Sequence, residues 1–210
     1  MSVDHDLHIN THITVPETAE VADITAAQLR RWVRTSEARR KDGNPRGTII
    51  SSEDRLSSGQ GSETLLSQHT VMQIFVAARL TERGVAVDDA LDAGRRFAHT
   101  GYEGRDPSEA FSQGTTWLLV AGSESQVVNI GKHNSDSHSD CYRYRSLEVA
   151  VSVFEDYLSN QGFGDPVAIA VTALNLTVAP NEITCRIKKV LQEKRPRNNR
   201  LNKNRKQING

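Results

Sequence analysis

The stretch VPETAEVADITAAQLRRWVR, residues 15–34, decides the fold of the N-terminal part of this 210-residue chain. Pro16 suits the first turn of a helix, and Thr25 can cap a second helix through its side-chain oxygen. The apolar and small positions that recur at helical spacing are Val15, Ala19, Ala22, Ala26, Ala27, Leu29, Trp32 and Val33. Two short helices joined by about three residues are the local anatomy of a helix-turn-helix.

Residues 36–64 are rich in Ser, Gly, Arg and Asp, with turn signals at 42–45 and 57–62, and are predicted to form a loop that contains a wing. A third helix is expected from about Leu66 to Arg83, and a fourth from about Val87 to His99. Residues 99–108 then have the composition of a linker. One core under the second helix is expected to hold Leu29, Trp32, Ile74, Phe75 and Leu80.

Beyond residue 108 the pattern favours a small mixed α/β module. Thr116–Ala121 and Gln126–Ile130 flank the turn GSES and predict a hairpin. A helix over Leu147–Leu158, a buried strand over Pro166–Leu174 and a helix over residues 180–192 follow. The predicted class is α+β, with a flexible leader at 1–12, a DNA-binding domain at 13–100, a self-association or sensor module at 108–192 and a disordered tail at 193–210.

Charge is unevenly distributed in this chain, although its formal net charge is zero. Residues 193–210 hold seven Lys or Arg against the single acid Glu193, and residues 28–46 hold seven against Glu37 and Asp42. Clustered positive charge is an electrostatic footprint for phosphate. No apolar run approaches the ~20 residues that cross a bilayer, and no signal peptide opens the chain, so a cytoplasmic protein without a membrane partner is expected.

The stretch at 15–34 resembles the opening of the MerR family, in which a small residue in the first helix is followed at a fixed interval by a turn, a Ser or Thr cap and a Leu-Arg-aromatic run. Ala19 stands at the small position, Asp23 where the family usually has Gly, and Thr25 at the cap. A second block at 69–91, HTVMQIFVAARLTERGVAVDDAL, resembles the family's next helix pair. The resemblance covers residues 13–98 and implies a winged helix-turn-helix that binds double-stranded DNA.

The predicted recognition helix carries side chains suited to DNA. The guanidinium groups of Arg30, Arg31 and Arg34 can fork onto guanine edges or bind phosphate, and Gln28 can pair with adenine. Thr25 and the free backbone amides at the helix start could add a phosphate contact. The alternative is that the arginines form the solvated face of an ordinary amphipathic helix.

Two further groups of cations are candidate phosphate contacts. The first lies in the predicted loop and consists of Arg39, Arg40, Lys41 and Arg46. The second is the tail, predicted to be a nonspecific nucleic-acid arm with Lys194, Arg195, Arg197, Arg200, Lys203, Arg205 and Lys206. Such contacts raise affinity without reading sequence. In both cases the alternative is a segment whose charges only serve solubility.

The loop KHNSDSHSDCYRYR contains the potential metal ligands His133, Asp136, His138, Asp140 and Cys141. Their spacing matches no closed tetrahedral pattern, so no metal is predicted. No nucleophile elbow and no phosphate-cradling glycine loop are present, so neither an enzyme nor a cofactor is predicted.

These observations predict a sequence-specific transcriptional regulator of MerR-like type, with double-stranded DNA as its partner, a homodimer as its state and RNA polymerase as a possible further contact. One alternative is an excisionase-like factor that bends DNA during recombination. Another, from a different class, is a non-enzymatic protein-interaction adaptor whose acidic body meets the partner.

Overall fold

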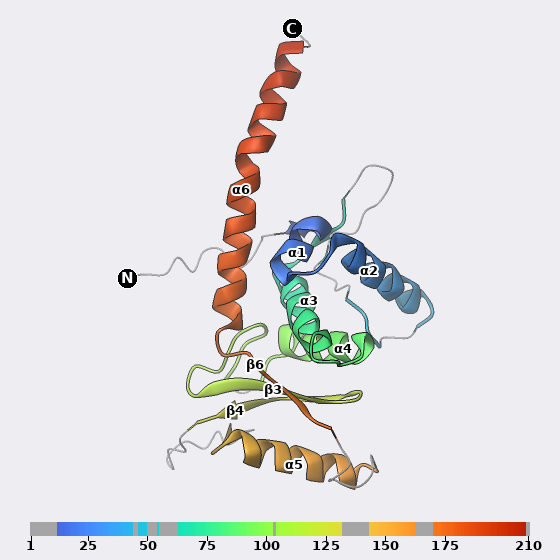
Figure 1. The fold of residues 1–210 in the computed structure, drawn as a ribbon, viewed down its shortest axis with the longest axis vertical. Helices are drawn as coiled ribbons and strands as arrows, with labels where there is room; N and C mark the ends of the chain where they lie inside the picture. The colour runs from blue at the N-terminus through green and yellow to red at the C-terminus, as the bar shows by residue number, and fades with distance from the viewer. Residues whose placement is uncertain are drawn as a thin grey trace.

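The computed structural model describes residues 12–43, 46–49, 54, 63–102, 104–131, 143–162 and 170–208, with the side chains of the last helix described as far as Glu193. Over these residues the chain is α+β, as the sequence predicts (Figure 1). The elements in order are β1 Ile13–Thr14, α1 Val15–Ala22, α2 Ala26–Lys41, β2 Leu65–Leu66, α3 Gln68–Thr81, α4 Val87–His99, β3 Thr115–Ala121, β4 Glu124–Ile130, β5 Arg143–Tyr144, α5 Leu147–Asn160, β6 Thr172–Asn175 and α6 Ala179–Ile208.

The helix α3 is the centre of the N-terminal half. It is buried on almost every side from Thr70 to Ala78, and α1, α4 and α6 all pack against it. A helix that is apolar all round must be covered on all sides, and the surrounding helices provide that cover. The expected core is confirmed, because one cluster of buried residues contains Leu29, Trp32, Ile74, Phe75 and Leu80.

The closest approach between α3 and α4 occurs at Gly94. A Cβ atom built there would lie 2.6 Å from the backbone oxygen of Gln73, which is closer than real side chains come to a backbone oxygen. The absence of a side chain therefore sets the spacing of the two helices. This contact explains why a residue with poor helix propensity stands inside α4.

Replacing Gly94 with alanine is expected to lower the free energy of unfolding by about 1 to 3 kcal/mol, because the new methyl group overlaps the α3 backbone. Helix propensity alone predicts the opposite sign, a gain of up to about 1 kcal/mol. Urea unfolding followed by circular dichroism measures the difference. A more stable Gly94→Ala protein would contradict the close approach.

The second half is built on an antiparallel hairpin of β3 and β4 within a four-stranded sheet of order β5-β4-β3-β6. The predicted hairpin is confirmed, with Gly122 at φ +55° in its two-residue turn. Successive residues face opposite sides of the sheet. Leu118, Val120 and Val127 join the core under the helices, whereas Leu119 and Val128 pack against α5.

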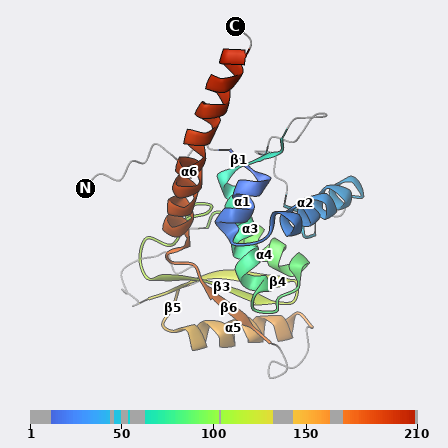
Figure 2. The ribbon, with the colours of Figure 1, turned by 45° about the horizontal axis from the view of Figure 1, so that its top comes forward.

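The sheet therefore lies between α5 on one face and the α3–α4 pair on the other (Figures 1 and 2). β6 begins at Thr172, later than the strand predicted over Pro166–Leu174, and residues 166–169 of that prediction lie outside the described residues. The N-terminal helices and the sheet share one buried cluster.

The described residues of the segment 99–108, predicted to be a linker, surround a buried arginine. Arg105 is 4% exposed and donates hydrogen bonds to backbone carbonyls, among them those of Phe97 and Glu109. Burial lowers the pKa of Arg105 to about 10, so the guanidinium remains charged at neutral pH. The composition of residues 99–108 is typical of a linker. A single arginine that binds several carbonyls leaves no periodic pattern in the sequence, so this contact could not be predicted.

The last helix, α6, packs on the N-terminal helices and then leaves the body of the molecule (Figure 1). Ile183, Ile187 and Val190 are buried, and Arg186 donates to the carbonyl of Val21 in α1. The backbone is helical as far as Ile208, whereas the sequence predicts a segment without regular structure from residue 193. Once packing has formed the first turns, each added residue other than Pro196 can contribute one more backbone hydrogen bond, and Lys, Arg and Gln propagate helices well.

Candidate nucleic-acid interface

The first two helices, α1 and α2, are joined by a short turn and both begin at a threonine cap. Thr14 caps α1 in a capping box with Glu17, and Thr25 caps α2 by accepting a hydrogen bond from the Gln28 amide at 3.1 Å. Asp23 ends α1 in the left-handed conformation at φ 61°. Aspartate tolerates this conformation better than most residues, which explains why it can stand where MerR-like sequences usually have Gly.

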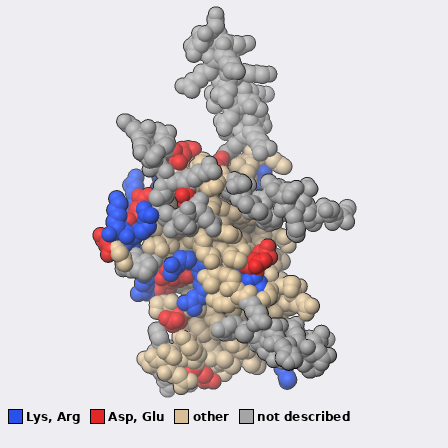
Figure 3. Space-filling view, turned by 180° about the vertical axis from the view of Figure 1, so that it is seen from behind, with Lys and Arg blue, Asp and Glu red and all other residues tan. Residues whose placement is uncertain are grey.

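The helix α2 separates a buried face from a basic face. Leu29, Trp32, Val33 and Ser36 are buried. The side chains proposed to reach DNA are exposed on the opposite side and its margins: Gln28, Arg30, Arg31, Arg34 and Lys41. Arg40, which continues the row of Val33 and Ser36 beyond the core, and the capping residue Thr25 are also exposed. In the space-filling view from behind, Lys and Arg gather over this side of the molecule (Figure 3).

The structure corrects one boundary in this region. Arg39, Arg40 and Lys41, predicted to lie in the loop, form the last turn of α2, which ends at Lys41. Cations in a last turn interact favourably with the helix dipole, and Arg, Lys and Ala are good helix formers. Residues 50–53 and 55–62, the main part of the segment in which a wing is predicted, lie outside the described residues.

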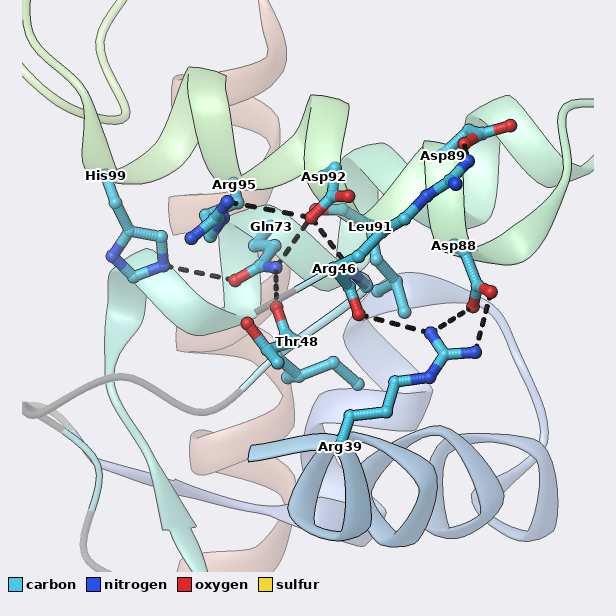
Figure 4. Close-up of polar contacts among 12 residues, drawn as sticks. Arg39, Arg46, Thr48, Gln73, Asp88, Asp89, Leu91, Asp92, Arg95 and His99 are labelled. Atoms are coloured by element: carbon cyan, nitrogen blue, oxygen red, sulfur yellow. Dashed lines mark hydrogen bonds and ion pairs between the residues drawn. The ribbon is translucent and has the colours of Figure 1, made fainter. Parts of the chain in front are cut away.

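Arg39 and Arg46 are held by carboxylates of α4 (Figure 4). Arg39 contacts both carboxylate oxygens of Asp88 at 2.6 Å, and it also donates to the carbonyl of Arg46. Arg46 donates to Asp89 at 2.5 Å. A phosphate would have to compete with these acids, whereas Arg30, Arg31 and Arg34 form no ion pair with a described residue.

The connection after α2 is fastened at several points by side chains that sequence reasoning did not single out. The Gly47 amide donates to Asp92 at 2.9 Å, and the Ile49 amide donates to the buried hydroxyl of Ser36 at 2.7 Å. The fully buried Gln73 donates to the carbonyls of Thr48 and Leu91. The only sign of these hydrogen bonds in the sequence is Gln73, a single polar residue in the apolar run VMQIFVAA.

At the far end of the connection, Asp54 accepts hydrogen bonds from the amide of Ser67 at 2.7 Å and from the hydroxyl of Thr70 at 3.0 Å. Both donors belong to the N-terminal turn of α3. The pairing of β1 with β2 places the residues before α1 beside the residues before α3. The start of the third helix is thus bound to both the connection and the first helix.

Replacing Asp88 with asparagine is expected to lower the free energy of unfolding at neutral pH by up to about 1 kcal/mol, a value discounted because the ion pair is partly exposed. The hydrogen bond from Arg39 lowers the pKa of Asp88. The carboxylate therefore contributes stability above the pKa of an unfolded carboxyl, and this contribution is lost as the pH falls through the lowered pKa.

Urea unfolding at neutral and at acidic pH checks the effect, with Asp156→Asn on the exposed side of α5 as the matched control. The difference between Asp88→Asn and the natural protein should shrink toward zero as the pH falls. A difference that stays constant with pH would contradict the role of the Asp88 charge.

The remaining predicted sites lie largely outside what the structure describes. The side chains from Lys194 to Lys206 are beyond the described part of α6, although their backbone is helical. His133, Asp136, His138, Asp140 and Cys141 lie outside the described residues. Among the residues that are described, no group of three or more His, Cys, Asp or Glu could hold a metal ion. Within the same part of the chain, every helix is too short or too polar to cross a membrane.

No protein-family model matches this chain, and no curated protein sequence matches it.

Proposed function

We propose that this protein is a sequence-specific double-stranded DNA-binding regulator of transcription, of MerR-like type, that works in the cytoplasm. The observation that carries the proposal is the division of α2 into a buried face and an exposed face with Gln28 and three arginines that form no ion pair with a described residue. A helix that is held from behind by a core and offers Arg and Gln side chains to solvent suits the major groove, which is about 12 Å wide.

The fastening of the connection supports the same proposal. A recognition helix reads bases only when its position is fixed, and the hydrogen bonds of Ser36 and Gln73 with the segment at 46–49 hold its neighbour in place. In this proposal Arg40 and Lys41 contact phosphate, whereas Arg39 and Arg46 serve first to hold the connection on α4. The tail cations of α6 add nonspecific affinity.

The direct test is a gel-shift titration of the full chain with genomic DNA fragments at two salt concentrations. We expect one or a few fragments to bind at least about 1000-fold more tightly than bulk DNA, which is the lower range of specific recognition. Equal affinity for every fragment would contradict sequence-specific regulation. It would favour either a factor that bends DNA or nonspecific binding through the cations of the C-terminal tail. An absence of any DNA binding at low salt would reject the proposal and leave the protein-interaction adaptor.

A homodimer is part of the proposal, and α5 offers a surface for it. Val149, Val153 and Tyr157 are 47%, 44% and 50% exposed and lie on successive turns. Their spacing is symmetric about Val153, so two antiparallel copies of α5 would pair Val149 with Tyr157 and Val153 with itself, as a two-fold interface requires. A second copy of the chain is therefore the proposed occupant.

Replacing Val153 with glutamate is expected to turn the dimer into a monomer, because two carboxylates would meet at the two-fold axis without compensation. Light scattering at several concentrations gives the mass. Ser152→Glu, one residue away and outside the symmetric row, is the control and should leave the mass unchanged. A natural protein that is monomeric at all concentrations would contradict the interface.

A further inference from the structure

A polar cleft of about 520 Å³ lies where α4 meets the turn between β3 and β4, away from the exposed face of α2. Its lining includes three basic side chains from consecutive turns of α4, namely Arg95, Arg96 and His99. The hydroxyl groups of Thr100 and Ser123 also border it. Among the described lining residues, the one carboxylate belongs to Asp92.

The two arginines of the cleft keep unused hydrogen-bonding capacity. Arg96 donates one N–H to the backbone carbonyl of Ser125 at 2.6 Å, which fixes the guanidinium at the cleft while most of its five N–H groups remain. Arg95 approaches Asp92 only to 3.7 Å, which is longer than a hydrogen bond. Two guanidinium groups thus face Asp92, the one acid among the described lining residues, and its carboxylate already accepts from the Gly47 amide.

The ring of His99 is positioned from inside the molecule (Figure 4). Gln73 uses its amide nitrogen for two backbone carbonyls, so its oxygen is the acceptor that faces His99 Nε2 at 3.2 Å. The imidazole must then donate from Nε2. The network therefore sets the orientation of the ring.

We propose that this cleft binds a small free oxyanion of the phosphate type. Arginine forks match phosphate oxygens, the hydroxyl groups add donors, and the charge of the described lining is positive in excess. The cleft is walled by α4 on one side and by the hairpin on the other, which suits a small anion rather than a duplex backbone.

The bound anion would be coupled to the connection after α2. Asp92 accepts the hydrogen bond of the Gly47 amide at 2.9 Å and is also the carboxylate nearest to Arg95. An anion that engages Arg95 removes this partner from Asp92 and places negative charge beside it. Gly47 belongs to the fastened segment next to α2, so anion binding would change the proposed affinity for DNA. By reciprocity, DNA binding would change the affinity for the anion by the same factor.

The binding site can be tested on the full chain without DNA, so its outcome is independent of the proposed function. Amide chemical shifts are followed by NMR while sodium phosphate is added, with sodium chloride at equal ionic strength as the reference. We expect saturable shifts at residues 92–100 and 123–125. Arg95→Gln should weaken binding about tenfold or more, because one charge-assisted contact is lost.

Two matched variants sharpen the test. Asp92→Asn should strengthen phosphate binding several-fold, since it removes a negative charge from the lining while an amide oxygen can still accept from Gly47. Arg145→Gln, at an exposed arginine before α5, should leave the affinity unchanged. Circular dichroism of each variant checks that it is folded.

Three results would overturn the proposal: no saturation with phosphate, shifts spread equally over all exposed cations, or an Asp92→Asn protein that binds no better. In the last measurement, the same titration is made with a duplex oligonucleotide in place of phosphate. Shifts at residues 92–100 with the duplex but not with phosphate would identify a contact to the DNA backbone and would also reject a free anion as the ligand.

Discussion

A protein in which Arg105 is replaced by leucine is expected to lose about 3 to 5 kcal/mol of its free energy of unfolding, the cost of breaking a buried charged network. Arg105 donates to the backbone carbonyls of Phe97, Asp106 and Glu109 at 3.0, 3.1 and 3.0 Å, and it also donates to Thr100. Leucine would leave these carbonyl oxygens without their donor in a site that is closed to water.

The stacking of the guanidinium adds to this loss. Its central carbon lies 4.8 Å from the ring centre of Phe97 and 5.3 Å from that of Tyr102. Leucine keeps apolar contact with these rings but lacks the cation–π attraction. The connection between α4 and β3 should therefore lose its shape, and the junction of the helices with the sheet should loosen with it.

Urea unfolding followed by the fluorescence of Trp32 and Trp117 measures the effect. Arg83→Leu is the matched control, since Arg83 is exposed in the turn after α3 and donates to one carbonyl, that of Arg79. It should cost less than about 0.5 kcal/mol. The loss of stability in Arg105→Lys should fall between those of Arg105→Leu and Arg83→Leu, because an ammonium group has three donors instead of five. A loss below about 1 kcal/mol in Arg105→Leu would contradict the role of this network.

The second large effect concerns DNA. Changing Arg30, Arg31 and Arg34 together to glutamine is expected to weaken binding to the specific site at least about 100-fold, because each well-placed arginine contributes about 1 to 3 kcal/mol. Each contact to phosphate that is lost should also reduce the slope of log affinity against log salt by about 0.9. The fold should survive, since all three side chains are exposed.

Single variants distinguish contacts with bases from electrostatic contacts with phosphate. Arg30→Ala should lower specific affinity more than nonspecific affinity if it contacts a base, and both equally if it contacts phosphate. The control changes three exposed cations on other elements, Arg83, Arg145 and Lys189, to glutamine. An equal loss in this control would show that net charge alone attracts the DNA and would refute an interface on α2.

Local signals in the sequence determined much of the N-terminal half. Thr25 caps α2 because its side chain needs only the amide of Gln28, which is three residues away. The hairpin at 115–130 follows from alternating apolar residues around Gly122, and the common core of Leu29, Trp32 and Phe75 follows from helical spacing. Capping, turn chemistry and periodicity act over a few residues, so they can be read without the fold.

Other features were decided only by the tertiary structure. Arg39 and Asp88 are 49 residues apart, and Arg46 and Asp89 are 43 apart, so their pairing depends on where α4 lies relative to α2. That placement follows from the burial of α3 and the close approach at Gly94. Arg105 was read as part of a linker because the carbonyls that it binds come together only when the chain has folded around it. The sequence identified which cations could bind phosphate, but the fold decided which of them were already bound to acids.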